Sequence, residues 1–298
     1  MLDDRIPTPF HEGELRAQQL AGGGPAGAPI RSRMPDQHRT FFPLLPFVCV
    51  AVADAQGWPL ATLLTGEPGF ASSPAPDRLR IAALPHADDP AGAHLRQGAD
   101  IGILGIDLGT RRRNRENGVI ADAGDGALLV DVRQSFGNCP KYIHVRRLAP
   151  VERERGGVQA FATELPADAL RLIARCETMF VASASGSAAQ PHARGLDISH
   201  RGGEAGFLRL AGNVITVPDY AGNRYFNTLG NLLLEPRAAL VMADFTSGDV
   251  LQLQGRAAIV WQGAPLPDGR AERAWTFTIT RGWLRRAAFP LRDPGVEG

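Results

Sequence analysis

Apolar residues along this chain gather in short runs bounded by glycine, proline and charged residues. Runs of this length that are rich in branched or aromatic side chains predict β-strands. We expect strands at residues 47–53, 57–64, 78–84, 101–108, 118–123 and 127–132, and again at 178–184, 193–199, 206–210, 213–217, 238–245 and 250–260. Their brevity and the regular turn residues between them predict a mainly β fold of antiparallel barrels with flanking helices.

Helical spacing is confined to a few stretches. It occurs at residues 10–20 and 166–175, and at 223–234, where Phe226, Leu229 and Leu233 recur at helical intervals. A linker rich in glycine, alanine and proline covers 21–29, and a charged break covers 151–157. We therefore expect an N-terminal extension at 1–33, a first module at 34–150 and a second module, with a C-terminal tail, at 151–298.

The pattern of the first module occurs again in the second. Several positions recur at unchanged spacing, namely Gly69–Phe70, Asp107 and Gly118 in the first copy and Gly206–Phe207, Asp244 and Gly255 in the second. Further upstream, the runs that begin at Phe47 and Pro59 match those that begin at Phe180 and Pro191 after a slip of one residue. A repeat of this length predicts two related modules.

Composition narrows the functional classes. The chain has 298 residues and a formal net charge of +1, so no global field favours nucleic acid or a membrane surface. No apolar run approaches the ~18 residues of a membrane span. Cys49, Cys139 and Cys176 lie far apart, and the histidines show no metal-binding spacing. We expect a cytoplasmic protein with reduced thiols and no metal site.

The segment 218–231 of the second copy is dense in hydrogen-bond donors. A Gly–Asn–Arg turn that enters a helix combines free backbone N–H groups with a guanidinium, and this combination suits a phosphate. Arg224 would supply the guanidinium, and Asn223, Asn227 and Thr228 would add neutral donors. The alternative is a helix cap with a surface arginine.

Two further sets of polar residues are candidates for a binding site. Gln252 and Gln254 alternate with leucines, so one strand face carries two amides, which suit the edge of a planar heterocycle or simply face solvent. In the first copy, the basic loop 111–115 indicates anion binding or an interface, or else a solvated turn. Asn138 and Cys139 lie on a loop controlled by glycine and proline, which we interpret as a structural loop or as one that lines a ligand, rather than as a covalent catalyst.

The order of these features in the second copy resembles the pyridoxamine 5′-phosphate oxidase-related FMN-binding split-barrel family. The stretches 104–115, 134–142 and 222–231 resemble a bacterial branch with two such modules in one chain, and the resemblance covers roughly residues 10–262. It implies two tandem split barrels with FMN at an interface. It assigns Arg194, Asn223 and Arg224 to the FMN phosphate, and Gln252 or Gln254 to the flavin ring.

The resemblance implies an FMN-dependent oxidoreductase that acts on a small molecule. NAD(P)H or a reductase would be the electron donor, and a homodimer is the expected assembly. The C-terminal arginine and histidine that hold pyridoxal phosphate in the oxidase have no match here, so we do not expect that activity. The alternative is a module that binds flavin or haem, or a protein partner, without turnover. The sequence nominates no catalytic residue.

Overall fold

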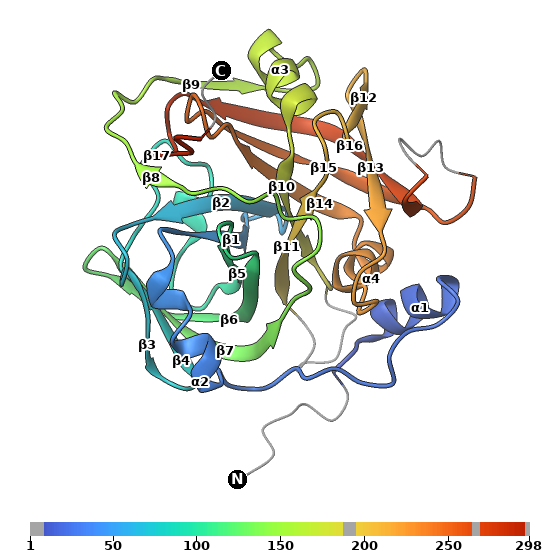
Figure 1. Ribbon diagram of the computed structural model, residues 1–298, viewed down its shortest axis with the longest axis horizontal. Coiled ribbons are helices and arrows are strands. Elements are labelled where there is room, and N and C mark those ends of the chain that lie inside the picture. The colour runs from blue at the N-terminus through green and yellow to red at the C-terminus, as the bar shows by residue number, and fades with distance from the viewer. Residues whose placement is uncertain (1–8, 187–194, 264–268, 296–298) are drawn as a thin grey trace.

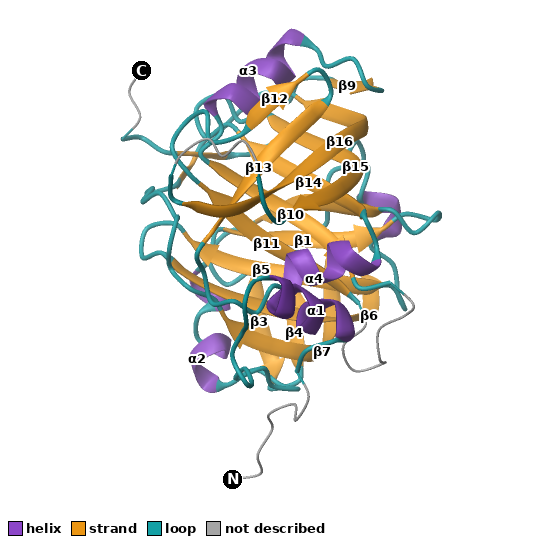
Figure 2. Ribbon diagram, turned by 90° about the vertical axis from the view of Figure 1, so that its right-hand side faces the viewer, coloured by secondary structure: helices purple, strands orange, loops and turns teal. Residues whose placement is uncertain are grey.

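The computed structural model describes residues 9–186, 195–263 and 269–295 and shows a mainly β protein. Two antiparallel sheets lie one above the other, and short helices flank them (Figures 1 and 2). The expectation of a mainly β fold with flanking helices is therefore confirmed. In the described part of the chain, no helix is long and apolar enough to cross a membrane.

The two sheets have the same strand order. The first runs β2 (Pro59–Thr65), β1 (Phe47–Ala53), β5 (Asp100–Asp107), β6 (Arg112–Gly124), β7 (Ala127–Gly137), β4 (Arg78–Ile81) and β3 (Ala71–Ala75). The second runs β11 (Leu196–Gly202), β10 (Thr178–Ala184), β14 (Arg237–Ala243), β15 (Val250–Val260), β16 (Ala271–Arg285), β13 (Val214–Tyr220) and β12 (Arg209–Ala211). β9 (Val158–Phe161) joins the second sheet through β16, and β8 (Ala149–Pro150) pairs with β17 (Leu291–Arg292).

The register of the central strands repeats as well. Gly118 pairs with Ile101, and Gly255 pairs with Ala238. A β-bulge falls immediately before each of these glycines. A Cβ atom on Gly118 would lie 2.1 Å from a backbone oxygen of β7, and one on Gly255 would lie 2.3 Å from a backbone oxygen of β16. Both positions therefore require glycine, which explains why the sequence repeat is clearest there.

The expected match between the runs that begin at Phe47 and Phe180 is wrong by two residues. Phe180 pairs with Val241, whose counterpart in the first sheet, Leu104, pairs with Cys49. Phe180 thus corresponds to Cys49 rather than to Phe47. A shift of two residues keeps every side chain on the same face, so the hydrophobic pattern cannot detect it. Pro59 opens β2, whereas its counterpart β11 opens at Leu196, and Pro191 lies outside the described residues.

Apolar side chains form a core inside each barrel and a third cluster between the two sheets. Alternate residues of β1 point to different cores: Val50 packs inside the first barrel, whereas Cys49 and Ala51 pack against the second module. Phe180 and Ala182 of β10 face them. The central strands of both sheets are therefore buried on both faces, and polar side chains can meet only at the margins of this interface.

Two of the helices, α1 (Glu12–Leu20) and α4 (Asn227–Leu234), lie at one of these margins. They pack together, and a Cβ atom on Gly13 would lie 2.3 Å from the Gly230 carbonyl oxygen. The others are α2 (Asp36–Arg39), α3 (Ala167–Arg175), and the 3₁₀ helices η1 (Phe42–Leu44) and η2 (Gly92–His94). The expected basic loop is shorter than predicted, because β6 already begins at Arg112.

Candidate functional site

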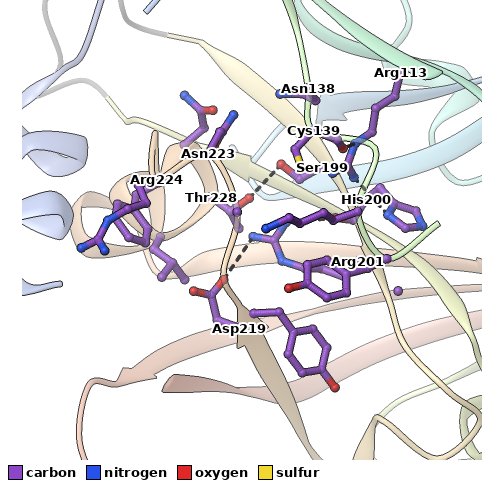
Figure 3. A pocket seen from close by; sticks show the side chains of 18 of the residues that line it. Arg113, Asn138, Cys139, Ser199, His200, Arg201, Asp219, Asn223, Arg224 and Thr228 are labelled. Carbon is purple, nitrogen blue, oxygen red and sulfur yellow. Dashed lines mark hydrogen bonds and ion pairs between the residues drawn. The ribbon is translucent and has the colours of Figure 1, made fainter. Parts of the chain in front are cut away.

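A pocket opens at the margin where the two modules meet (Figure 3). Its walls come from β6 and the segment after β7 in the first module, and from β11, the end of β13 and the start of α4 in the second. It holds about 820 Å³ of free space, its open mouth included.

The pocket is strongly basic. Arg113, Arg115, Lys141 and Arg201 line it, and Asp219 is the sole carboxylate among the lining residues that the structure describes. Burial, together with the charges of Arg115 and Arg201, lowers the pKa of Arg113 to about 9. Burial also lowers the pKa of Arg201. The lowered pKa values mean that the charged forms of these guanidinium groups are destabilised, and a bound anion would stabilise them.

Arg115 connects the two modules. Its Nη1 lies 2.9 Å from Oδ1 of Asp197, and its Nη2 donates to Oγ of Ser199 at 2.8 Å. Nη1 also donates to Oδ1 of Asn227 at 3.2 Å. Arg115 and Asp197 are each only 5% exposed, so this pair is shielded from water. Arg115 therefore holds α4 and β11 against β6.

Arg113 and His200 form a second link across the interface. Arg113 donates from Nε to the Cys139 carbonyl oxygen at 2.7 Å, and from Nη1 to Nδ1 of His200 at 3.1 Å. Burial, followed by the charges of Arg113 and Arg201, holds the pKa of His200 well below its ordinary value. A neutral imidazole that accepts at Nδ1 carries its proton on Nε2. His200 is therefore a hydrogen-bond donor at neutral pH.

Several buried polar atoms around the pocket have no hydrogen-bond partner among the described residues. They are Nε of Arg115, Nε of Arg201, Nε2 of His200 and Oδ1 of Asn138. An unsatisfied buried polar group costs about 1–3 kcal/mol. Such atoms gathered around one cavity indicate a polar ligand, and since most of them are donors, they indicate an acceptor-rich one.

The backbone around the pocket is unusual. Tyr142, Arg224 and Phe226 line it and have left-handed φ angles of 64°, 60° and 61°. Such conformations are strained for non-glycine residues and concentrate at functional sites. Phe226 precedes α4, and among the residues that the structure describes no side chain caps this helix at the pocket wall.

Two aromatic rings form one side of the pocket. Tyr142 and Tyr220 are stacked, with their centroids 4.9 Å apart and an interplanar angle of 27°. The Tyr142 hydroxyl donates to the carbonyl oxygen of Ala221 at 3.0 Å, which fixes its ring. A pair of fixed rings beside a basic pocket suits a ligand with both a planar and an anionic part.

The structure brings together five of the residues predicted for the cofactor site: Asn138, Cys139, Asn223, Arg224 and Asn227 all line this pocket. Arg224, however, donates to the carbonyl oxygens of Ala21 and Gly23 in the N-terminal segment. In Figure 3 its guanidinium points away from Arg113 and Arg201. Its main contact is therefore with the chain itself rather than with the pocket interior.

The remaining predicted residues do not lie at the pocket. Gln252 donates to the carbonyl oxygen of Ala61 at 2.9 Å, and Gln254 donates to that of Pro59 at 2.8 Å. Both side chains point from β15 towards β2 of the other module and are buried there, so a role beside a flavin ring in this pocket does not fit them. Arg194 lies outside the described residues.

Sequence reasoning missed several lining residues, above all His200, Arg201 and the stacked tyrosines. Arg113 and Arg115 belong to the basic stretch 111–115, for which anion binding or an interface role was expected, and both line the pocket. Arg113 and Arg115 are two apart, so on a strand they share a face, whereas the stretch was interpreted as a loop. His200 and Arg201 follow an apolar strand without any motif.

A smaller polar pocket adjoins the first and shares Asn227 with it. Glu14 of α1 lies there, and its carboxylate accepts from the Asn227 amide and from the backbone N–H of His11. Burial raises the pKa of Glu14 to about 8. The N-terminal helix therefore contributes a carboxyl group that is largely protonated at neutral pH.

Comparison with known proteins gives distant structural likenesses. No family model matches the chain, and no curated protein matches it. HupZ of Group A Streptococcus is 12% identical over 40% of this chain and 92% of its own, with a TM-score of 0.31. A protein of Mesorhizobium loti described as FAD-binding is 10% identical over 44% and 98%, with a TM-score of 0.29. HutZ, the haem storage protein of Vibrio cholerae, is 10% identical over 41% and 95%, with a TM-score of 0.28.

Proposed function

We propose that this chain binds FMN in the pocket between its two modules and acts as a flavoprotein of the pyridoxamine-phosphate-oxidase-like split-barrel type. The observation that carries this proposal is the convergence of buried and half-buried arginines from both modules on one cavity with unsatisfied donors. A phosphate monoester carries close to two negative charges at neutral pH and offers acceptor oxygens only. Its chemistry matches the surplus of positive charge and of donors.

The pocket also suits the planar part of FMN. The stacked Tyr142 and Tyr220 provide a flat wall. The amide of Asn138 has an unpartnered oxygen, which can accept from a ring N–H. The residues present therefore fit a phosphorylated planar cofactor.

Bound FMN would supply the capacity to accept and release electrons, and the chain would supply binding and orientation. Arg113 and Arg201 would neutralise the phosphate, while His200 would donate from Nε2. Arg115 would hold the two modules in the spacing that the cofactor requires. We propose electron transfer to or from a small molecule as the activity, with NAD(P)H or a reductase as the donor.

The test is a titration of cofactor-free protein with FMN, followed by quenching of flavin fluorescence. Arg113→Met should raise the Kd about 10-fold or more, because a charge-assisted hydrogen bond contributes about 1.5–3 kcal/mol. Arg112→Met is the matched control, since Arg112 is the next residue of β6 and is exposed over the ring of Phe41. Equal Kd values for the two variants, or no FMN binding by the wild type, would refute the proposal.

The same samples distinguish the alternatives. A haem protein would show a Soret band, whereas an FMN protein would show the two visible bands of an oxidised flavin. Bound FMN that neither NAD(P)H nor a reductase can reduce would identify a binding module without turnover.

A further inference from the structure

Because the two sheets repeat, the candidate pocket has a counterpart on the other side of the module interface. At the candidate pocket, Arg113 of β6 lies opposite Asn138, and its carbonyl oxygen accepts from the backbone N–H of Asn138. In the second sheet, Val250 of β15 takes the position of Arg113, and Arg285 of β16 takes the position of Asn138. Cross-strand partners point to the same face of a sheet. Each of these two cross-strand pairs therefore has one arginine, which comes from β6 in the first sheet and from β16 in the second.

The rest of the counterpart is built on the same plan. Ser199, which contacts Arg115, pairs with Val181, and its counterpart Thr62 pairs with Val50. Gln252 takes the register position of Arg115. The short helix η2 takes the place of α4 in the chain order. The counterpart thus retains an arginine, a hydroxyl and an amide.

Asp89 lies at the centre of these donors. Its Oδ1 accepts from the backbone N–H of Ala91 at 2.9 Å and from Nε2 of Gln252 at 3.0 Å. Its Oδ2 accepts from Nη1 of Arg285 at 2.8 Å and from the hydroxyl of Thr62. Asp89 is 5% exposed, so these contacts are closed to water. Each carboxylate oxygen has two donors, as a bound anion would.

Arg285 and Arg113 differ in whether a carboxylate neutralises them. Arg285 pairs with Asp89 and, at 2.7 Å, with Asp88. Arg113 makes no ion pair within the described ranges and contacts neutral groups. We propose that the counterpart is a second anion-binding site of this fold and that Asp89 fills it from within. Resting on the FMN assignment above, the chain then binds one cofactor, at the open site alone.

We call the location that Asp89 fills the closed site and the candidate pocket the open site. The test removes the Asp89 carboxylate from the closed site and offers acetate in its place. Asp89→Ala leaves Arg285 with less of its charge compensated, and we expect its Tm to fall by about 6 °C or more. Sodium acetate, at an ionic strength held constant with chloride, should then raise the Tm of Asp89→Ala more than that of the wild type. The open site is present in both proteins, so the difference reports the closed site.

The variant Asp89→Ala/Arg285→Met is the control, because it lacks the arginine that would hold acetate. Its Tm should respond to acetate no more than that of the wild type. An equal response of Asp89→Ala and the wild type would overturn the proposal. If Asp89→Ala does not fold, wild-type stoichiometry decides: one FMN per chain supports the closed site, and two overturn it. If FMN does not bind at all, the proposed function fails, while the acetate comparison still tests the closed site.

Discussion

Arg115 allows the strongest test of how the two modules are joined. Arg115→Met removes the guanidinium and leaves the buried carboxylate of Asp197 with Asn117 and Ser199 as its neighbours. Removing one partner of a buried ion pair costs about 3–5 kcal/mol. At roughly 2–4 °C per kcal/mol for a protein of about this size, we expect the Tm to fall by about 6–20 °C.

The assay is urea denaturation followed by tryptophan fluorescence, with the free energy of unfolding extrapolated to water. Arg115→Met/Asp197→Leu removes both charges and should recover most of the loss, because an apolar pair often replaces a buried ion pair at little cost. Arg112→Met should change stability by no more than about 0.5 kcal/mol. A loss below about 1 kcal/mol in Arg115→Met, or a double variant as unstable as the two single variants added together, would refute this account of the interface.

Three further outcomes follow from the contacts described above. Arg224→Ala should leave FMN affinity almost unchanged but expose the 21–29 linker to limited proteolysis, because Arg224 holds Ala21 and Gly23; a large loss of FMN affinity would return Arg224 to the cofactor site. Gly255→Ala should lower the unfolding free energy by about 1–3 kcal/mol or more in urea, whereas Gly157→Ala, which meets no neighbour, should not. The raised pKa of Glu14, about 8 against an ordinary 4.5, means that the native state binds its proton more tightly than the unfolded state. The resulting stabilisation is complete below about pH 4.5 and is lost as the pH rises through 8; Glu14→Gln should remove this part of the slope in urea titrations at a series of pH values, and an unchanged slope would contradict it.

Much of the fold could be predicted because its constraints are local. Gly118 and Gly255 admit no side chain, so both copies keep glycine at the same place and the repeat is visible. The match of Phe47 to Phe180 failed because the alternation of apolar and polar residues indicates which face of the sheet a residue occupies. It does not indicate which residue of the neighbouring strand lies opposite. Register between distant strands depends on backbone pairing, which no residue type in those strands reveals.

The site could be predicted only in part because it forms between modules. Asn138, Cys139, Asn223 and Asn227 drew attention because their segments carry turn residues and donors, and all four line the pocket. The glutamines of β15 were misplaced because their partners, the carbonyl oxygens of β2, lie almost 200 positions earlier in the chain. Backbone carbonyls leave no trace in a sequence. Arg224 lines the pocket as expected, but its contacts with the carbonyl oxygens of Ala21 and Gly23 could not be predicted, for the same reason.

The joining of the two barrels in one chain has a consequence for how such a protein can evolve. In a symmetric dimer of identical subunits, every substitution appears at both sites, so neither site can change alone. Here the positions of Arg115 and Gln252 belong to separate codons and can be selected independently. Joining the two barrels in one chain therefore allows one edge of the interface to evolve towards ligand binding, while the other edge evolves towards holding the two modules together.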